Sequence, residues 1–490
     1  MKRSILFLVT FALLSAPTWL HAELKLAKLF TDHLVLQQEL PIAVWGFADL
    51  AAEVTVEFNA KIQKATADKL GSWRVDLPAM SADGVSHTLQ VTSGTQRVTC
   101  KDVLLGEVWI CGGQSNMGRP VTGDQTKSAD NPQIRLFNIS GNVPRSGGID
   151  DTHGWVICSP ESIAVAGDGS KEKGRRGFTE VGYVFGRRLQ KELKVPVGLI
   201  QMNCGGSTAK DWTPTRGVAD ALVLDEPMKG LTHKPGVLYE VRIRGMVPFT
   251  ARGVVWYQGE DDGRNKNYAK DFAEMIAAWR GLFSRDDLPF YFAQIAQTTY
   301  ASGMLGVWES QQWVMNNVPH TGLAVSNDIY DGTKNGGFKL RVDSEIALPI
   351  AGGGNPHPTG KDRVAERLAR IALANTYGRD QGIIYGPMYK SHKIVDGKIQ
   401  VTFQHVGSGL KTNDNKMPNW FELSDGTKDG RRTKYKHAEA KIIGKDTIEV
   451  WSSNVSDPTQ VRFGWHPLTR FNLINVEGLP AVSFRTDSDS

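Results

Sequence analysis

The sequence predicts an α/β protein in which a mostly parallel sheet, covered by helices on both faces, lies between two β-rich regions. Between residues 105 and 377, buried strands alternate with segments whose apolar residues recur at helical spacing. Residues 23–104 and 378–490 instead contain short strand-like runs. Alternating strands and helices indicate a parallel sheet, whereas closely spaced short strands are typical of a β-sandwich. The 490 residues suffice for about three domains.

The first 22 residues have the pattern of a secretory signal peptide. Lys2 and Arg3 precede the apolar run Ile5–Leu14, and Ala22 offers a small residue for cleavage. The run is shorter than the roughly 18 residues that a membrane helix needs, and no later stretch reaches that length. We therefore expect an exported protein, periplasmic or extracellular, without a membrane span.

The N-terminal β region follows from short runs of strand-forming residues. Turns rich in Gly, Pro, Asp and Ser separate the runs at strand-sized intervals, as expected for a sandwich. The runs are Leu34–Leu36, Ile42–Trp45, Val54–Phe58 and Leu89–Val91.

The central region contains buried strand-like runs and helical stripes. The strands are Val108–Cys111, Pro196–Met202, Gly253–Tyr257, Phe290–Ile295 and Leu323–Val325. The stripes lie in Val181–Leu193, Tyr268–Trp279 and Val364–Ile371. Ligands of such sheets bind beyond the carboxyl ends of the strands, so the turns there are the places to look for chemistry.

The β pattern returns after Tyr377-Gly378, where the glycine suits the end of a helix. The later strand-like runs are Ile399–Phe403, Thr447–Trp451 and Val461–Phe463. They predict a C-terminal β-rich region over residues 378–490.

Charge and cysteine content exclude some functions. The formal charge is +5 without a Lys/Arg block, so no nucleic-acid partner is implied. No Cys-x-x-Cys or His-rich spacing indicates a metal site, and no cofactor is expected. In an oxidising compartment the cysteines allow three pairings, and buried free thiols are the equal alternative. The cysteines are Cys100, Cys111, Cys158 and Cys204. The oligomeric state stays open.

The turn Gly113-Gln114-Ser115-Asn116-Met117 follows the first central strand. A serine just past a strand end is a common way to present a nucleophile, although an incidental serine in a polar turn is the alternative. A hydroxyl nucleophile needs a base and oxyanion donors. His357, just before a helix, is the candidate base, because a helix N-terminus disfavours the imidazolium. A surface or hydrogen-bonded histidine is the alternative.

Two further turns offer the remaining parts. Gly205 and Gly206 follow a strand, and paired glycines let backbone N–H groups approach a ligand closely. Gln258 could donate through its amide, and Glu260 could orient His357. The acidic run that starts at Glu260 could instead bind a cation or cap a helix, and the glycines could form an ordinary turn.

The turns at residues 113–117, 256–260 and 357–358, in this order, resemble those of the sialate O-acetylesterase family, a branch of the Ser–Gly–Asn–His (SGNH) hydrolases. The resemblance covers almost the whole mature chain. Its other motifs are Val35–Gln37 with Val44–Gly46, Gly106–Trp109, Gly478–Ala481 and Phe484-Arg485.

The resemblance implies an SGNH-like three-layer α/β/α esterase domain over residues 105–377, which removes acetyl groups from sugars. Ser115 would attack the acetyl carbonyl, and His357 would move the protons. The oxyanion hole would comprise the Ser115 N–H, an N–H of Gly205 or Gly206, and Gln258. The partner would be an acetylated carbohydrate, with sialic acid, xylan, pectin and algal polysaccharides all open.

At two positions the sequence departs from the family pattern, and these departures leave open which acidic residue orients His357. Asn355 stands where family members usually carry Asp, so we expect Glu260 to orient His357, with Asp328 or Asp331 in reserve. Asp262 stands where the family often has Asn, and we expect it to point away or to contact sugar hydroxyls.

These departures motivate a second hypothesis, a carbohydrate-binding protein on a weakened esterase scaffold. A metal-dependent hydrolase is a distant third. The long glycine-rich segment 335–354 is expected to shape the cleft or to act as a lid.

Overall fold

The computed structural model describes most of the chain, and the predicted signal peptide, residues 1–22, lies outside the described part. Within that part, no helix combines the length and apolar character that a bilayer crossing requires. The described residues are 23–139, 154–166, 177–215, 234–300, 303–329, 339–342, 346–349, 356–430 and 432–487.

The central sheet brings three turns to one edge. Its main path is β10-β9-β11-β8-β12-β13-β14, with all neighbours parallel except the edge strand β10. Asn203 at the end of β11 and Tyr257 at the end of β12 both lie opposite Gly113 at the end of β8. The turns that follow these strands therefore meet. The bounds are β8 (Gln96–Gly113), β9 (Asn131–Asn138), β10 (Val156–Cys158), β11 (Val197–Asn203), β12 (Gly253–Tyr257), β13 (Phe290–Ala293) and β14 (Thr321–Ala324).

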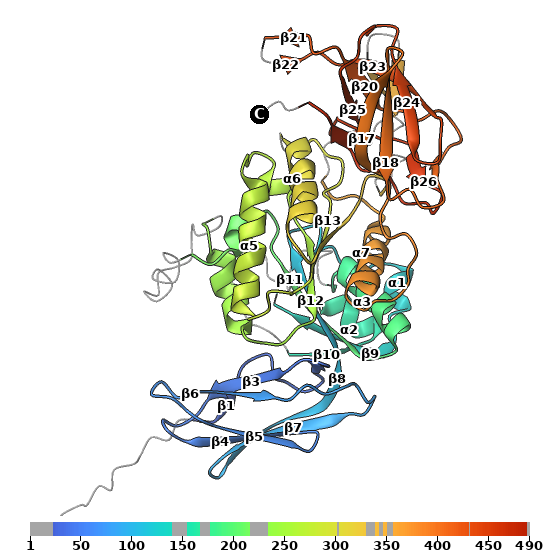
Figure 1. The fold of residues 1–490 in the computed structure, drawn as a ribbon. Helices are drawn as coiled ribbons and strands as arrows, with labels where there is room; N and C mark the ends of the chain where they lie inside the picture. The colour runs from blue at the N-terminus through green and yellow to red at the C-terminus, as the bar shows by residue number, and fades with distance from the viewer. Residues whose placement is uncertain are drawn as a thin grey trace, which may run out of the picture.

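Helices cover both faces of this sheet (Figure 1). α3 (Glu180–Leu193) and α7 (Lys361–Asn375) pack together on one face, while α5 (Tyr268–Leu282) and α6 (Met304–Asn317) pack on the other. β11 and β12 are buried at every residue because helices lie above and below them. Shorter elements are α1 (Asp124–Lys127), α2 (Pro160–Val165), η2 (Ala209–Trp212), η3 (Tyr239–Ile243), η4 (Arg244–Met246) and η5 (Glu260–Asp262).

The N-terminal strands form two groups that share one core with the central sheet. β1, β3 and β6 make an antiparallel sheet, whereas β4, β5 and β7 join the first part of β8. β8 is thus one continuous strand across the predicted domain boundary at residue 104. The bounds are β1 (Lys25–Leu26), β2 (Val35–Gln37), β3 (Ile42–Phe47), β4 (Glu53–Phe58), β5 (Lys61–Thr66), β6 (Ser72–Leu77) and β7 (His87–Ser93).

The C-terminal strands build a separate core around a seven-stranded sheet in the order β17-β18-β24-β23-β20-β25-β27. This region lies beyond the central helices, at the opposite end from the N-terminal strands (Figure 1). The bounds are β17 (Met388–Val395), β18 (Lys398–Gln404), β19 (Leu410–Thr412), β20 (Phe421–Ser424), β21 (Lys428–Asp429), β22 (Arg432–Thr433), β23 (Lys436–Ile442), β24 (Thr447–Trp451), β25 (Gln460–Phe463), β26 (Leu473–Asn475) and β27 (Phe484–Arg485).

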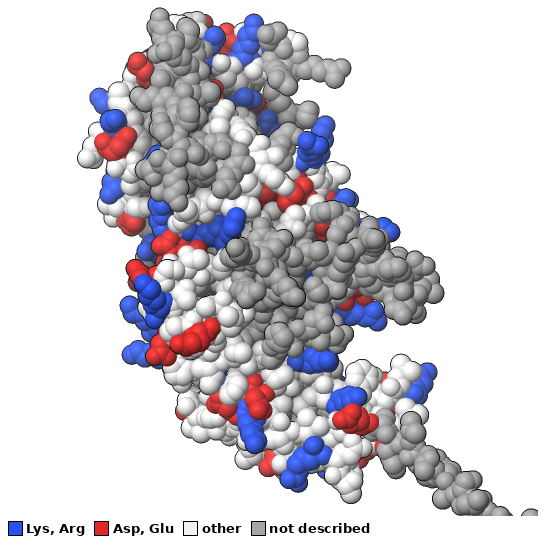
Figure 2. All heavy atoms as spheres, turned by 180° about the vertical axis from the view of Figure 1, so that it is seen from behind, with Lys and Arg blue, Asp and Glu red and all other residues white. Residues whose placement is uncertain are grey.

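Part of the glycine-rich segment before His357 forms a hairpin of β15 (Lys339–Val342) and β16 (Ile346–Pro349). The rest of residues 335–354 lies outside the described part. The role of this segment in a cleft or lid therefore stays a prediction. On the face that Figure 2 shows, acidic and basic side chains are mixed over the described atoms, in keeping with the small formal charge of +5.

All four cysteines are free thiols. Cys100, Cys111 and Cys158 are buried, and Cys204 is partly buried beside the glycine turn. Burial raises the pKa of the Cys204 thiol and that of Cys100, the latter to about 12. Of the two alternatives that the sequence left open, the structure therefore shows free thiols and no disulfide.

Candidate active site

The turn after β8 presents Ser115 at the carboxyl edge of the sheet. Gly113 has a φ of +137°, and a Cβ there would lie 2.2 Å from the Tyr257 carbonyl oxygen, so glycine is required. The Gln114 N–H donates to that carbonyl (3.0 Å), and the Met117 N–H donates to the Gln114 carbonyl (3.0 Å). These bonds close a tight turn in which Ser115 remains partly exposed.

His357 lies against this serine although 242 residues separate them in the chain. Its Nε2 atom is 2.8 Å from Ser115 Oγ, which is a hydrogen-bond distance. The structure thus brings together the predicted nucleophile and the predicted base. Asn355 and Asp331 lie outside the described residues.

The glycine turn after β11 borders the serine. A Cβ at Gly205 would lie 3.7 Å from the Cβ of Ser115, and Gly205 itself is exposed. The Cys204 N–H donates to the Gly113 carbonyl (3.0 Å), which ties the two turns together. Gly206 has a φ of +74°, a conformation that favours glycine. The glycine turn therefore lies next to Ser115, and the part of Gly205 or Gly206 in an oxyanion hole stays a prediction.

Gln258 is placed differently from its predicted position in the oxyanion hole. Its buried amide nitrogen donates to the Ser207 carbonyl (3.0 Å) and to Asp262 Oδ2 (2.6 Å). Its Oε1 accepts from the Tyr268 hydroxyl (3.1 Å). An amide has two N–H donors, and both are used. The Gln258 amide holds the loops behind the site together, because the buried Asp262 carboxylate and Ser207 carbonyl need donors. It therefore has no N–H left for an oxyanion at Ser115.

Asp262 points away from the serine toward the Gln258 amide, one of its two expected positions. Its Oδ2 accepts from the Ala209 N–H (2.9 Å) and its Oδ1 from the Asn265 amide (3.0 Å). Burial raises the pKa of this carboxyl, and the hydrogen bonds from Asn265, Ala209 and Gln258 oppose that effect.

Glu260 lies behind the serine turn, and its hydrogen bond within the described structure goes to Asn116 rather than to the imidazole. The carboxyl is buried, and its Oε1 accepts from the Asn116 amide. Burial raises the pKa of Glu260 to about 7, despite the opposing effects of its own backbone N–H, Asn116 and Lys361. This geometry differs from the predicted direct contact with His357.

Lys361, which the sequence analysis did not identify, completes the group behind Ser115. Its Nζ donates to Asn116 Oδ1 (2.6 Å) and lies 5.2 Å from the centre of the Tyr257 ring. Burial lowers the pKa of Lys361 to about 7, although the Glu260 charge opposes this. The Asn116 amide also donates to the Pro356 carbonyl (2.9 Å), directly before His357. Asn116 thus joins the serine turn, the histidine segment, η5 and α7.

A buried lysine in the first turn of a helix is doubly unfavourable, because both burial and the helix dipole oppose its charge. Lys361 is only 2% exposed at the start of α7. Such a residue is tolerated when it is paired, as here with Asn116 and the nearby Glu260 carboxyl. The sequence shows that Lys361 follows Gly360 near the start of a predicted helix. The spacing of apolar residues, however, does not reveal that a lysine is buried or which polar groups it contacts.

Asp328, one of the reserve acids, pairs with arginines instead. Its oxygens accept from Arg367 at 2.7 and 2.6 Å and from Arg363 at 3.4 Å. Burial alone would raise the pKa of this carboxyl, but the Arg367 bonds and the two arginine charges outweigh burial and lower it. Asp328 therefore clamps α7 to the loop after β14.

Tyr300 is a second residue that the sequence analysis did not identify. Its ring is 51% exposed, and its hydroxyl donates to Asp261 Oδ1 (3.4 Å). Asp261 Oδ2 accepts from the side chain of Gln114 (2.9 Å), the neighbour of Ser115. An exposed aromatic ring is thereby tied to the serine turn.

The site holds a serine hydroxyl within hydrogen-bond distance of an imidazole nitrogen, and the glycine turn lies next to the serine. These are the parts that attack on an acyl carbon requires. The site lies at the carboxyl ends of β8, β11 and β12, as expected for a parallel sheet.

Comparisons with known proteins relate the chain to carbohydrate esterases. Residues 105–348 match the family model for carbohydrate esterase, sialic acid-specific acetylesterase. The sialate O-acetylesterase of Homo sapiens is 28% identical over 450 residues, which cover 82% of this chain and 80% of that protein. The sialate O-acetylesterase of Pongo abelii is 27% identical over 470 residues, covering 86% and 84%.

One solved structure points to the same class of enzyme. A carbohydrate acetylesterase from Xanthomonas citri superposes with a TM-score of 0.77 at 29% identity, covering 95% of this chain and 99% of that one. The family range includes the turns of Ser115, Gly205 and Glu260. Residues 105–348 are therefore a carbohydrate esterase domain of the sialic acid-specific acetylesterase family, and the protein is a carboxylic ester hydrolase.

Proposed function

We propose that this protein is an exported serine esterase that removes O-acetyl groups from carbohydrates through an acyl-enzyme on Ser115. The observation that carries the proposal is the 2.8 Å distance between Ser115 Oγ and His357 Nε2. The parallel sheet with helices on both faces further supports an SGNH-type three-layer fold with β-sandwich-like flanks. The assembled serine and histidine speak against a protein that only binds sugars.

In the first half of the reaction, Ser115 Oγ attacks the acetyl carbonyl carbon while its proton moves to His357 Nε2. The negative oxygen that develops accepts hydrogen bonds from the Ser115 N–H and from backbone N–H at Gly205 or Gly206. The bond between the acyl carbon and the sugar oxygen then breaks. His357 gives its proton to that oxygen, and the sugar leaves with a free hydroxyl.

In the second half, a water molecule attacks the acetyl carbon of the acyl-enzyme. His357 takes the proton of the water and returns it to Ser115 Oγ as acetate leaves. Three candidates remain for the group that supports the imidazolium. Asn355 or the reserve acid Asp331 supports it directly, or Glu260 does so through Asn116, whose amide bridges that carboxyl and the Pro356 carbonyl.

Acetate release from acetylated glycans and from p-nitrophenyl acetate tests the proposal. Ser115→Ala is expected to lower kcat by about 10⁴-fold or more, whereas Ser456→Ala, at an exposed serine in the C-terminal region, keeps full activity. Mass spectrometry after a short reaction should find one acetyl group on Ser115. Acetate release by Ser115→Ala at the wild-type rate would refute the proposal. The predicted export is tested by N-terminal sequencing of protein recovered from the periplasm or the medium, which should begin at Glu23.

A further inference from the structure

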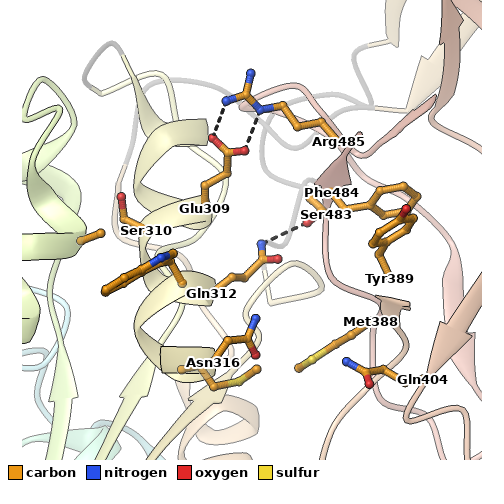
Figure 3. Close-up of a pocket in the computed structure, with 13 residues that line it drawn as sticks. Glu309, Ser310, Gln312, Asn316, Met388, Tyr389, Gln404, Ser483, Phe484 and Arg485 are labelled. Atoms are coloured by element: carbon orange, nitrogen blue, oxygen red, sulfur yellow. Dashed lines mark hydrogen bonds and ion pairs between the residues drawn. The ribbon is translucent and has the colours of Figure 1, made fainter. Parts of the chain in front are cut away.

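A groove runs along α6, away from Ser115. One part, of about 500 Å³, lies between α6 and the C-terminal sheet (Figure 3). Another part, of about 450 Å³, lies between α5 and α6. Trp313 and Ala269 line both parts, so the two hollows meet at the indole. Each volume is within the roughly 300–1,000 Å³ range of ligand pockets.

The lining combines an exposed aromatic ring with amides that make no hydrogen bond within the described part of the chain. Trp313 is 48% exposed, an unfavourable position for a large apolar side chain in water. Asn316 from α6 and Gln404 from β18 flank the groove (Figure 3). Both are exposed, and neither side chain makes a hydrogen bond to any residue that the structure describes. They leave donors and acceptors available to a ligand.

The charges on the C-terminal side of the groove are paired. Arg485 donates to both carboxylate oxygens of Glu309, at 2.6 and 3.0 Å (Figure 3). On the other side, Lys270 lies 3.7 Å from Glu274. An aromatic face and available amides match the ring and the hydroxyls of a sugar, and Lys266 adds a positive charge to the part of the groove beside α5. The C–H face of the sugar ring packs on the electron-rich indole face, and its hydroxyls bond to the amides.

The position of the groove suits sugars beyond the one that reacts. Val307 of α6 packs against Gly259, which directly precedes Glu260. A Cβ on that glycine would lie only 2.9 Å from the valine side chain. Trp313 follows about 9 Å further along the helix axis, at 1.5 Å per residue. A ligand there does not touch the acetyl group, so a polysaccharide has to be several sugar units long to occupy both places.

We propose that the groove around Trp313 is a second carbohydrate-binding site, which holds sugar units of the polymer that carries the acetyl group. This inference rests on the proposed esterase function and makes its substrate a polysaccharide rather than a free monosaccharide. Asn316 and Gln404 would bond the hydroxyls of the units next to the indole.

Steady-state kinetics of Trp313→Ala on two substrates tests the proposal. With acetylated xylan, KM is expected to rise about tenfold at constant kcat, because uniform binding is lost and the reacting atoms are untouched. With p-nitrophenyl acetate, kcat/KM is expected to stay at the wild-type value. Leu70→Ala, at a side chain that is 76% exposed in the N-terminal region, should change neither. An unchanged KM for xylan, or equal losses on both substrates, would overturn the proposal.

Binding separates this inference from the proposed function. Ser115→Ala should bind deacetylated xylo-oligosaccharides in calorimetry, and the Ser115→Ala/Trp313→Ala variant should not. If wild type released no acetate from any acetylated glycan, the proposed function would fail. If it released acetate while Trp313→Ala matched wild type in both assays, only the groove assignment would fail. A dimer in sedimentation that Trp313→Ala dissociates would assign the groove to a second copy instead and refute the proposal.

Discussion

Asn116 is the residue through which the buried charges act on the serine turn. Its amide oxygen accepts from Lys361 (2.6 Å), while its nitrogen donates to Glu260 and to the Pro356 carbonyl (2.9 Å). The side chain next in sequence to Ser115 is therefore fixed from three sides. Rotating this amide would displace the Ser115 hydroxyl relative to the imidazole, and small displacements of a reacting group are costly.

Lys361→Met should lower kcat for p-nitrophenyl acetate by on the order of tenfold or more with little change in KM, because Asn116 loses its donor. The variant should also unfold more easily in urea, by about 1–3 kcal/mol, since the buried amide oxygen of Asn116 loses its donor. Lys127→Met, at an exposed lysine, is the matched control and should lose at most about 1 kcal/mol.

A double-mutant cycle tests whether the Lys361 and Glu260 side chains act on each other across the Asn116 amide. Lys361→Met combined with Glu260→Gln should be more stable than the sum of the single effects predicts. Strict additivity would mean that the two side chains do not act on each other through Asn116.

Sequence reasoning reached Ser115, His357 and the glycine turn because each stands in a motif at the end of a strand or the start of a helix. It misplaced Gln258, whose buried amide serves Asp262 and Ser207. Which acceptor an amide chooses depends on contacts between distant loops, and the type of residue alone does not reveal it. Lys361 stayed hidden for the same reason.

At the scale of elements, apolar spacing predicted α3, α5 and α7, whose buried residues recur every three or four positions. It did not predict α6, in which the polar Gln311 is buried within the apolar stripe and Trp313 is exposed. Nor did it predict that β8 continues through Gln96–Gly113. Its first half pairs with β7 and its second half with β11 and β12, and only the fold shows that one strand serves both groups.

The position of α7 depends on the Asp328–Arg367 pair, since this helix carries Lys361 and directly follows the His357 segment. Asp328→Asn should lower the free energy of unfolding at pH 7 by about 1.5–3 kcal/mol, the usual loss for a bond to a charged group. It should also lower kcat more than it changes KM. Asp124→Asn, at an exposed carboxyl, is the matched control.

The pH dependence of this loss follows from the sign of the pKa shift. Folding lowers the pKa of Asp328, so the pair stabilises the protein above the usual pKa of an aspartate and is lost as the pH falls through the lowered value. Urea unfolding at pH 7 and near pH 2 should therefore show a large difference between wild type and Asp328→Asn at pH 7 and a small one in acid. Equal differences at both pH values would contradict the assignment.

For the whole molecule, the cores indicate which regions unfold together. The N-terminal strands and one face of the central sheet share a single apolar cluster, whereas the C-terminal strands have their own. Polar contacts agree, because Glu107 of β8 accepts from Gln37 (3.1 Å), Gln38 (2.8 Å) and Arg252 (2.8 Å). This buried carboxyl needs donors from both the N-terminal and the central region.

A chain that starts at residue 105 should therefore fail to fold, because it removes the strands that pair with the first part of β8 and leaves Glu107 without Gln37 and Gln38. A chain of residues 23–382 should keep its fold and turn over p-nitrophenyl acetate, since the C-terminal core lies entirely beyond it. Calorimetry of the full chain should show two transitions. Esterase activity should be lost in the transition that the 23–382 chain also shows. A soluble, active 105–487 chain would show that β8 does not couple the two regions.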